Sequence, residues 1–204
     1  MEIILATHNL DKCKELQKSF NNTNIKIYTL KDFPEIGEIV EDGLTLKENA
    51  LIKANKIHFI TGLPTIADDT GLEVDFLNGA PGVYSARFAG EDCSYADNVN
   101  KMINDLNGVP INQRGAVFKT SMVFIDKNME LSTEGVVEGY IAEEPKGIGG
   151  FGYDPLFYVK SIGKTFAEMS IKEKNRISHR GKAIKNLSNL LKSNVNLKLK
   201  EEDA

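Results

Sequence analysis

Apolar and polar residues follow two different periods along this chain, and these periods separate expected strands from expected helices. Short apolar runs predict buried strands at residues 2–6, 25–30 and 65–67. Apolar positions three or four apart predict helices over residues 10–20 and 44–60. Gly62 is typical of the end of the second helix. The beginning of the chain is therefore expected to be α/β.

The middle of the chain has another pattern, in which β-branched and aromatic residues roughly alternate with other residues. This pattern predicts long strands at residues 116–126 and 131–142, separated by a turn at Asn128. A shorter apolar run predicts a further strand at residues 156–159. This part of the chain is expected to be rich in β-structure.

Helical spacing returns at residues 99–106 and again after Ser178, a residue type that caps helices. No internal repeat or linker divides the chain. We therefore expect a single α/β domain over residues 1–204, with a mixed central sheet flanked by helices. Both chain ends would form an α/β lobe, and the middle would form a smaller β-rich lobe.

Composition and charge narrow the class of protein. The chain has 204 residues, 41% of them hydrophobic and 26% charged, with a net charge of −4 and no long basic block. A nucleic-acid polymer is therefore not an expected partner. No apolar run approaches the length that spans a membrane, and the start of the chain does not resemble a signal peptide. Two isolated cysteines, Cys13 and Cys93, are typical of a reducing compartment, so we expect a cytoplasmic protein.

A glycine-rich stretch, KGIGGFGYDP at residues 146–155, has the letter pattern of a dinucleotide-binding fingerprint. That fingerprint must follow a strand and open a helix, but Pro145 and Pro155 favour a loop on both sides. The four residues Phe151, Gly152, Tyr153 and Asp154 have two interpretations. Their aromatic rings could stack on a nucleobase, or they could pack in the core around a tight turn, and the residues alone favour the core.

The segment between the first strand and the first helix is a candidate phosphate site. The start of a helix offers backbone N–H groups, and Thr7, Asn9 and Lys12 add a hydroxyl, an amide and a positive charge. The alternative is a helix capped by Asn9 with a solvated Lys12. On these residues alone the alternative is favoured.

Two adjacent carboxylates, Asp68 and Asp69, follow the apolar run at residues 65–67, which we expect to end there. They repel each other unless a positive group lies close, and Mg²⁺ suits that place because it takes oxygen ligands. Glu41 is a candidate second ligand. The alternative is a turn with solvated charges. Lys53, on the helix over residues 44–60, could point at this site or be a solvated lysine.

A last cluster of cations consists of Lys174, His179 and Arg180. Cations are unfavourable at the start of a helix, so a nearby anion or carbonyl oxygen would stabilise this cluster. No Gly-x-Ser-x-Gly motif or Cys/His pair indicates a covalent nucleophile. The candidate residues favour a metal-assisted attack of water on a phosphate.

Five blocks of the sequence resemble the inosine triphosphate pyrophosphatase family: ATHNLDK, ENALIKA, ADDTGLEVDFLNGAPGVYSARFAG, GGFGYDPLF and KNRISHRGKA. The resemblance extends over about residues 3–192. It implies hydrolysis of ITP, dITP and XTP to the monophosphate and pyrophosphate, with Mg²⁺ or, as a substitute, Mn²⁺. It also implies a homodimer, and an elongated fold with the active site in a cleft between two lobes.

The resemblance assigns roles to individual positions. Asp69 would be a metal ligand and the general base, supported by Asp68, with Glu41 as the second ligand. Lys53 would be a further catalytic residue. Thr70, where many members have Ser, would contact the substrate. Phosphate would be bound by Thr7, His8, Asn9, Leu10, Asp11 and Lys12. The nucleobase pocket would be formed by Phe151, Gly152, Tyr153, Asp154, Lys174, His179 and Arg180.

Donation from Lys174 or Arg180 to a 6-oxo group would exclude adenine, which has an amino group there. Two other functions stay open on the sequence. The first is a pyrophosphatase for modified or pyrimidine triphosphates, as in the related Maf-like proteins. The second is a nucleotide-binding module without turnover.

Overall fold

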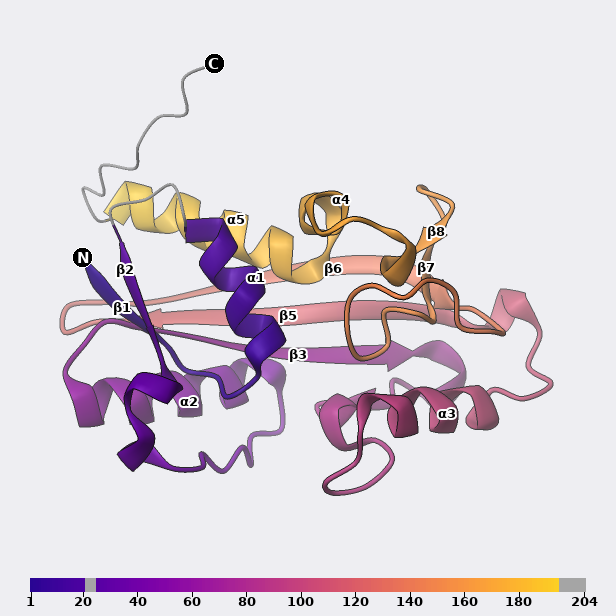
Figure 1. Ribbon diagram of the computed structural model, residues 1–204, viewed down its shortest axis with the longest axis horizontal. Helices are drawn as coiled ribbons and strands as arrows, with labels where there is room; N and C mark the ends of the chain where they lie inside the picture. Colours follow the sequence, from indigo (N-terminus) through magenta and orange to yellow (C-terminus); the bar gives the residue numbers. More distant parts are fainter. Residues whose placement is uncertain (21–24, 195–204) are drawn as a thin grey trace, which may run out of the picture. The chain divides into compact units, whose positions relative to one another are not determined.

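The computed structural model describes residues 1–20 and 25–194 (Figure 1). Its helices are α1 (Leu10–Phe20), α2 (Leu46–Thr61), α3 (Tyr95–Asp105), α4 (Ile171–Ile177) and α5 (His179–Asn194). Its strands are β1 (Glu2–Leu5), β2 (Lys26–Thr29), β3 (Thr65–Val74), β4 (Pro81–Gly82), β5 (Gly115–Ile125), β6 (Glu130–Ile141), β7 (Phe157–Val159) and β8 (Lys164–Thr165). The expected mixed α/β fold is confirmed.

The strands form one mixed sheet in the order β2-β1-β3-β5-β6-β7-β8, with β4 paired to β3. Strand β1 runs parallel to β2, with Ile3 opposite Ile27, and parallel to β3. The pairs β3–β4, β6–β7 and β7–β8 are antiparallel. Parallel pairs of strands require crossover connections. In the order of the chain, α1 connects β1 to β2, and α2 lies between β2 and β3.

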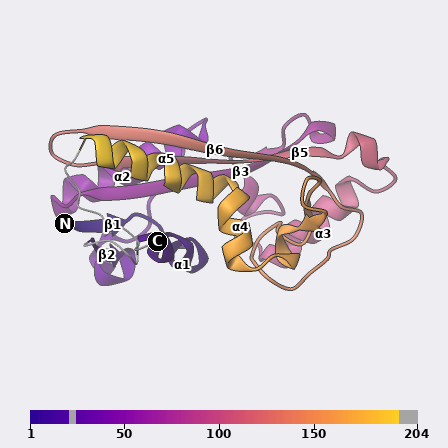
Figure 2. The ribbon, with the colours of Figure 1, turned by 90° about the horizontal axis from the view of Figure 1, so that it is seen from above.

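The chain divides into two compact units. Of the described residues, the first unit comprises 1–20, 25–69, 121–134 and 183–194, and the second comprises 70–120 and 135–182. Strands β3, β5 and β6 and helix α5 contribute residues to both units. The turn that joins β5 to β6 closes a hairpin in the first unit, where Asp126 N donates to Met129 O at 3.0 Å (Figures 1 and 2).

Two apolar clusters form the core of the first unit. Residues alternate along β1, so Ile3 and Leu5 join one cluster, whereas Ile4 and Ala6, the residue after the strand, join the other. The first cluster includes Leu16 of α1 and residues 183, 184, 187 and 191 of α5. The second includes residues 50, 54 and 57 of α2. Strand β1 is buried on both faces, which explains its continuous apolar run.

Helix α2 carries residues of the candidate site, and both of its ends are fixed locally. Thr45 caps the first turn by accepting from Glu48 N, and the Glu48 carboxylate accepts from Thr45 N. The helix ends at Gly62, whose φ of 69° is left-handed. The expected helix over residues 44–60 and its glycine end are confirmed.

The second unit has one core, in which α3 packs with β3, β5, β6 and β7. The rings of Phe118, Phe157 and Phe166 form its aromatic centre. Arg114 is also buried there, and its guanidinium donates to three backbone carbonyls, at Leu106, Val109 and Ala142. Hydrogen bonds from all three guanidinium nitrogens explain how this charged group is accommodated in the core.

Several short elements were not expected from the sequence. Helix α4 and strands β4 and β8 were missed, and the two carboxylates expected after a strand end lie inside β3. Strand β3 does not end at residue 67, because Leu72 and Val74 alternate into the core of the second unit. In the described residues, no helix is both long and apolar enough to cross a membrane.

Candidate active site

Asp68 and Asp69 are neighbours in β3 but are neutralised by different lysines. Successive side chains of a strand point to opposite faces of the sheet. Asp68 is fully buried and lies 3.4 Å from the Lys12 ammonium of α1, whereas Asp69 lies 3.8 Å from the Lys53 ammonium of α2. The mutual repulsion of the two carboxylates is therefore relieved by one cation on each face.

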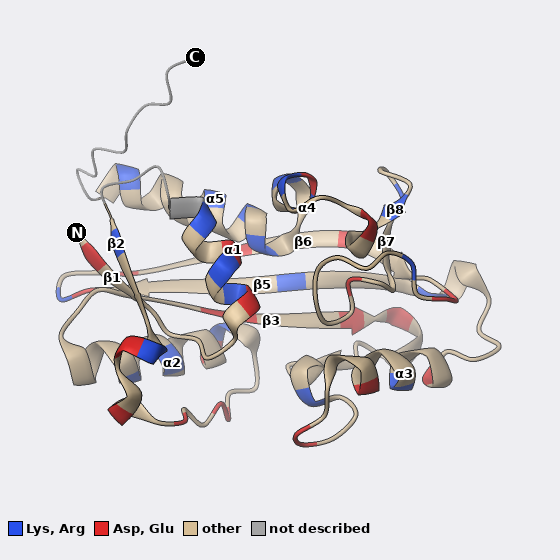
Figure 3. Cartoon of the chain, in the orientation of Figure 1, with Lys and Arg blue, Asp and Glu red and all other residues tan. Residues whose placement is uncertain are grey.

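Lys53 links two carboxylates that come from distant parts of the chain. Its ammonium lies 2.6 Å from Glu41 Oε2 and 3.8 Å from Asp69 Oδ1, and its side chain is only 6% exposed. The solvated-lysine interpretation is therefore wrong for Lys53. Figure 3 shows further acidic residues in the loop that carries Glu41 toward α2. The structure thus brings Glu41, Lys53 and Asp69 together, which was one of the two interpretations that the sequence left open for Lys53.

Asn49 belongs to the same group and was missed by the sequence analysis. Its side-chain Nδ2 donates to Asp69 Oδ2 at 3.1 Å, and its Oδ1 accepts from Gly43 N at 2.8 Å. The available signal was its spacing from Lys53, because residues four apart lie on one face of a helix. A buried amide on the face of Lys53 was therefore foreseeable.

The segment before α1 was interpreted either as a phosphate site or as a helix cap with a solvated Lys12, and the structure has features of both. Asn9 caps the helix, and its Oδ1 accepts from Asp11 N at 3.0 Å and from Lys12 N at 3.1 Å. These two N–H groups, which the sequence analysis offered to phosphate, already have an acceptor. Lys12 is not solvated, however, because its side chain is 13% exposed beside Asp68.

Thr7 and His8 hold this segment in place, whereas Leu10 and Asp11 do not. The Thr7 side-chain oxygen accepts from Asn9 N at 3.2 Å, and His8 Nε2 donates to Gly37 O at 3.0 Å. Leu10 is exposed, and Asp11 pairs with Lys14 at 3.1 Å. Of the six candidate phosphate ligands, Lys12 contributes the positive charge, and Thr7, His8 and Asn9 hold the backbone of the segment by hydrogen bonds.

The donor set of the first unit suits a hard divalent cation. Glu41 and Asp69 each place a carboxylate oxygen within 4.0 Å of one positively charged nitrogen, that of Lys53. Mg²⁺ is commonly held by one or two carboxylates and completes its shell with substrate phosphates and water. Within the described ranges, no group of three or more His, Cys, Asp or Glu side chains could hold a metal ion. The pair therefore fits a cation that is shared with a phosphate ligand.

Cys13 follows Lys12 on α1, and the environment of its thiol makes it a poor nucleophile. Burial is the main effect that raises the pKa of the Cys13 thiol, and the Asp68 carboxylate raises that pKa further. The thiol donates to Thr7 O at 3.7 Å. Covalent catalysis through Cys13 is therefore disfavoured, in agreement with the sequence analysis.

The second group of candidate residues lies in the second unit and centres on a buried ion pair. Lys174, in the last turn of α4, donates to Asp154 Oδ2 at 2.6 Å, and the two residues are 4% and 2% exposed. The same Asp154 oxygen accepts from Phe151 N at 2.8 Å. A side chain at Gly150 would collide with the Asp154 carboxylate, and its φ is 70°. Glycine is therefore required where the loop passes this carboxylate.

Arg180 and His179 begin α5, as expected, and both are buried. Arg180 Nη2 donates to Thr70 Oγ1 at 3.1 Å, and this hydroxyl shares a 2.7 Å hydrogen bond with the Thr120 hydroxyl. His179 stacks on Phe118, with ring centres 4.5 Å apart. Thr120 was missed, because nothing in its strand pattern distinguishes it from other buried polar residues.

The two aromatic residues of the glycine-rich loop have different environments. Phe151 is partly exposed, with the Lys174 ammonium 4.8 Å and the Arg180 guanidinium carbon 5.5 Å from its ring centre. Tyr153 is 4% exposed within the core of the second unit, and its hydroxyl donates to Ser85 O at 3.0 Å. The core interpretation therefore fits Tyr153, and the ligand-facing interpretation is retained for Phe151.

Substitution Tyr153→Phe tests this division. We expect it to lower the free energy of unfolding by about 1 kcal/mol, the typical contribution of one hydrogen bond. We also expect the KM for the nucleotides that the family resemblance implies as substrates to stay unchanged, because burial keeps this hydroxyl from a ligand. Denaturant unfolding and steady-state kinetics measure the two quantities. A large increase in KM without loss of stability would contradict this prediction and indicate that Tyr153 contacts the substrate.

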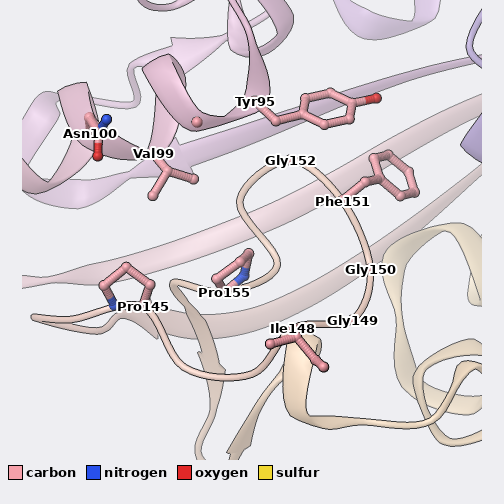
Figure 4. Close-up of a pocket in the computed structure, with 11 residues that line it drawn as sticks. Tyr95, Val99, Asn100, Pro145, Ile148, Gly149, Gly150, Phe151, Gly152 and Pro155 are labelled. Carbon is pink, nitrogen blue, oxygen red and sulfur yellow. The ribbon is translucent and has the colours of Figure 1, made fainter.

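A pocket of about 340 Å³ adjoins the glycine-rich loop (Figure 4). One wall is α3, with Tyr95 and Val99, and the other is the loop itself, with Ile148 and Phe151. The loop neither opens a helix nor follows a strand directly, so the dinucleotide interpretation stays disfavoured. The residues that line the pocket do not include Asp154, Lys174, His179 or Arg180.

Comparisons with known proteins find similar chains over nearly the whole length of this one. The model of the Ham1 family matches residues 3–190. A dITP/XTP pyrophosphatase of Thermoanaerobacter sp. (strain X514) is 47% identical over 191 residues, which cover 94% of this chain and 96% of that protein. One of Listeria innocua is 49% identical over 187 residues, covering 91% and 92%. The solved structure of a HAM1 protein from Coxiella burnetii has a TM-score of 0.86 and 41% identity, covering 95% of this chain and 99% of that one.

Proposed function

The chain belongs to the Ham1 family, and on that premise we propose that it hydrolyses the triphosphates of non-canonical purines, dITP, XTP and ITP, to monophosphate and pyrophosphate. The observation that carries this proposal is the 47% identity to a dITP/XTP pyrophosphatase over 94% of the chain. The buried charged groups of the first unit support it, because they suit a phosphate ligand and a divalent cation.

Glu41 and Asp69 would hold the cation, which we propose to be Mg²⁺, with Mn²⁺ as a substitute. When bound, such an ion neutralises charge that develops on phosphate oxygens during the reaction. Lys12 and Lys53 would contribute to the same neutralisation. Their low exposure strengthens this effect, because charges interact more strongly away from bulk water.

Asp69 would act as the general base. Its two oxygens lie near Asn49 Nδ2, at 3.1 Å, and the Lys53 ammonium, at 3.8 Å, and these contacts hold the carboxylate in place. We propose that this carboxylate takes the proton of the water that attacks the α-phosphorus, and that pyrophosphate leaves. Asp68 would act indirectly by holding Lys12.

Residues of the second unit would recognise the purine nucleobase of the substrate. Phe151 offers a partly exposed ring for stacking, and Lys174 and Arg180 carry donors close to that ring. A donor directed at position 6 of the purine accepts hypoxanthine and xanthine and rejects adenine.

We also propose the homodimer that the family resemblance implies, which light scattering of the purified protein tests.

A panel of nucleotides tests the proposed function. We expect pyrophosphate release from dITP, XTP and ITP with Mg²⁺, and about 10⁴-fold lower kcat/KM for ATP, because a site that requires a hydrogen bond rejects ligands that lack it. Removal of divalent ions with EDTA should abolish release. Preference for UTP or dTTP would instead favour a Maf-like specificity, and binding without any release would indicate a nucleotide-binding module.

A further inference from the structure

Five residues of the first unit form a closed ring of contacts around the proposed cation ligands. Asn49 donates to Asp69, and Asp69 lies beside the Lys53 ammonium. That ammonium also contacts Glu41, at 2.6 Å. Two residues after Glu41, Gly43 N donates back to Asn49 Oδ1 at 2.8 Å. The ring thus ties the acidic loop, helix α2 and strand β3 to one another.

Asn49 is suited to this place because its amide has both a donor and an acceptor. A backbone N–H can only donate, so the amide oxygen must face Gly43 and the NH₂ group must face the Asp69 carboxylate. One side chain therefore fixes a proposed metal ligand on the strand and the loop that carries the other. An aspartate or a leucine could not make both contacts.

Helix stability does not explain an asparagine at this position. Asn49 is 2% exposed, and α2 has alanines at the neighbouring buried positions Ala50 and Ala54. Alanine favours the helix more than asparagine does, and a buried amide is costly unless it is fully hydrogen-bonded. The contact with the loop is also close, because a Cβ at Gly43 would lie 2.7 Å from Asn49 Oδ1.

We propose that Asn49 is a positioning residue, which sets the distance between Glu41 and Asp69 and thereby the affinity of the protein for its divalent cation. The inference rests on the proposed function only for the identity of the two metal ligands. Residues that orient metal ligands typically change metal affinity by 10- to 100-fold when they are removed.

The test measures Mn²⁺ binding to the nucleotide-free protein by electron paramagnetic resonance, so the readout does not depend on turnover. We expect Asn49→Ala to weaken Mn²⁺ binding by about 10-fold or more. Gly43→Ala is a second variant, which keeps every charged residue of the chain but pushes the loop that carries Glu41 away from Asn49 and the first turn of α2. We expect it to weaken Mn²⁺ binding as well.

The matched control is Asn98→Ala. Asn98 is also 2% exposed, on α3, and its amide also bridges two backbone groups, accepting from Ala89 N and donating to Ala86 O. We expect this variant to lose stability and to keep its Mn²⁺ affinity.

Wild-type Mn²⁺ affinity in folded Asn49→Ala would overturn the inference, and so would an equal loss in Asn98→Ala. If Asn49→Ala does not fold, unchanged affinity in Gly43→Ala overturns it. A wild-type protein that binds no Mn²⁺ also overturns it. If the Asn49 and Gly43 variants lose affinity as expected but the wild type releases no pyrophosphate from dITP, the proposed function fails while the role of Asn49 stands.

Discussion

Substitution Asp69→Asn is expected to lower the rate of pyrophosphate release from dITP by about 10³-fold while the protein stays folded. The amide keeps the size of the side chain but cannot accept the proton of the attacking water. It also removes a negative charge beside Lys53 and Glu41. Steady-state kinetics with saturating Mg²⁺ measures the loss, and circular dichroism measures folding.

Saturating metal separates the two roles of Asp69. If the residue served only as a metal ligand, a higher Mg²⁺ concentration would restore turnover in Asp69→Asn, and we expect no such recovery. Asp126→Asn is the matched control. Asp126 Oδ1 accepts from Asn128 N and Met129 N in a turn, and an asparagine oxygen can do the same, so activity should not change. Turnover above one tenth of the wild-type rate in Asp69→Asn would remove this residue as the general base.

The second large effect is expected at the buried ion pair of the second unit. Lys174→Met leaves the Asp154 carboxylate buried without its cation, which should lower the free energy of unfolding by about 3–5 kcal/mol. The double variant Lys174→Met/Asp154→Asn removes both charges and keeps an oxygen for Phe151 N, so most of this stability should return. Denaturant unfolding of the three proteins measures the difference.

The double variant also separates stability from recognition. Although folded, it lacks the ammonium that would donate to the purine, so we expect its kcat/KM for dITP to fall by about 10²-fold. Lys119→Met is the control, because Lys119 also lies 2.6 Å from its partner, Glu73, but that pair is 39% and 38% exposed. An exposed pair contributes about 0–1 kcal/mol. Wild-type kcat/KM in the double variant would exclude Lys174 from base recognition.

The local pattern of the sequence predicts much of this fold. Helix α2 was foreseen at both ends because its spacing and its final glycine are local signals. Strand β1 was foreseen because burial on both faces requires an unbroken apolar run. Helix α4, of seven residues, was missed because so short a helix has little periodicity to detect.

The candidate site depends on contacts that no local pattern specifies. The sequence predicted that β3 ends before Asp68 and Asp69, because charged residues are rarely buried without partners, but the strand continues through both residues. Their partners, Lys12 and Lys53, come from two helices far away in the sequence. Only the folded chain shows that these lysines are buried, and only the packing of the loop separates Phe151 from the buried Tyr153.

The measurement that tests the central claim most directly is hydrolysis of dITP in water enriched in ¹⁸O, followed by mass spectrometry of both products. Attack of water on the α-phosphorus predicts one ¹⁸O atom in the monophosphate and none in pyrophosphate. Label in pyrophosphate, or release of orthophosphate as the first product, would contradict the proposed reaction.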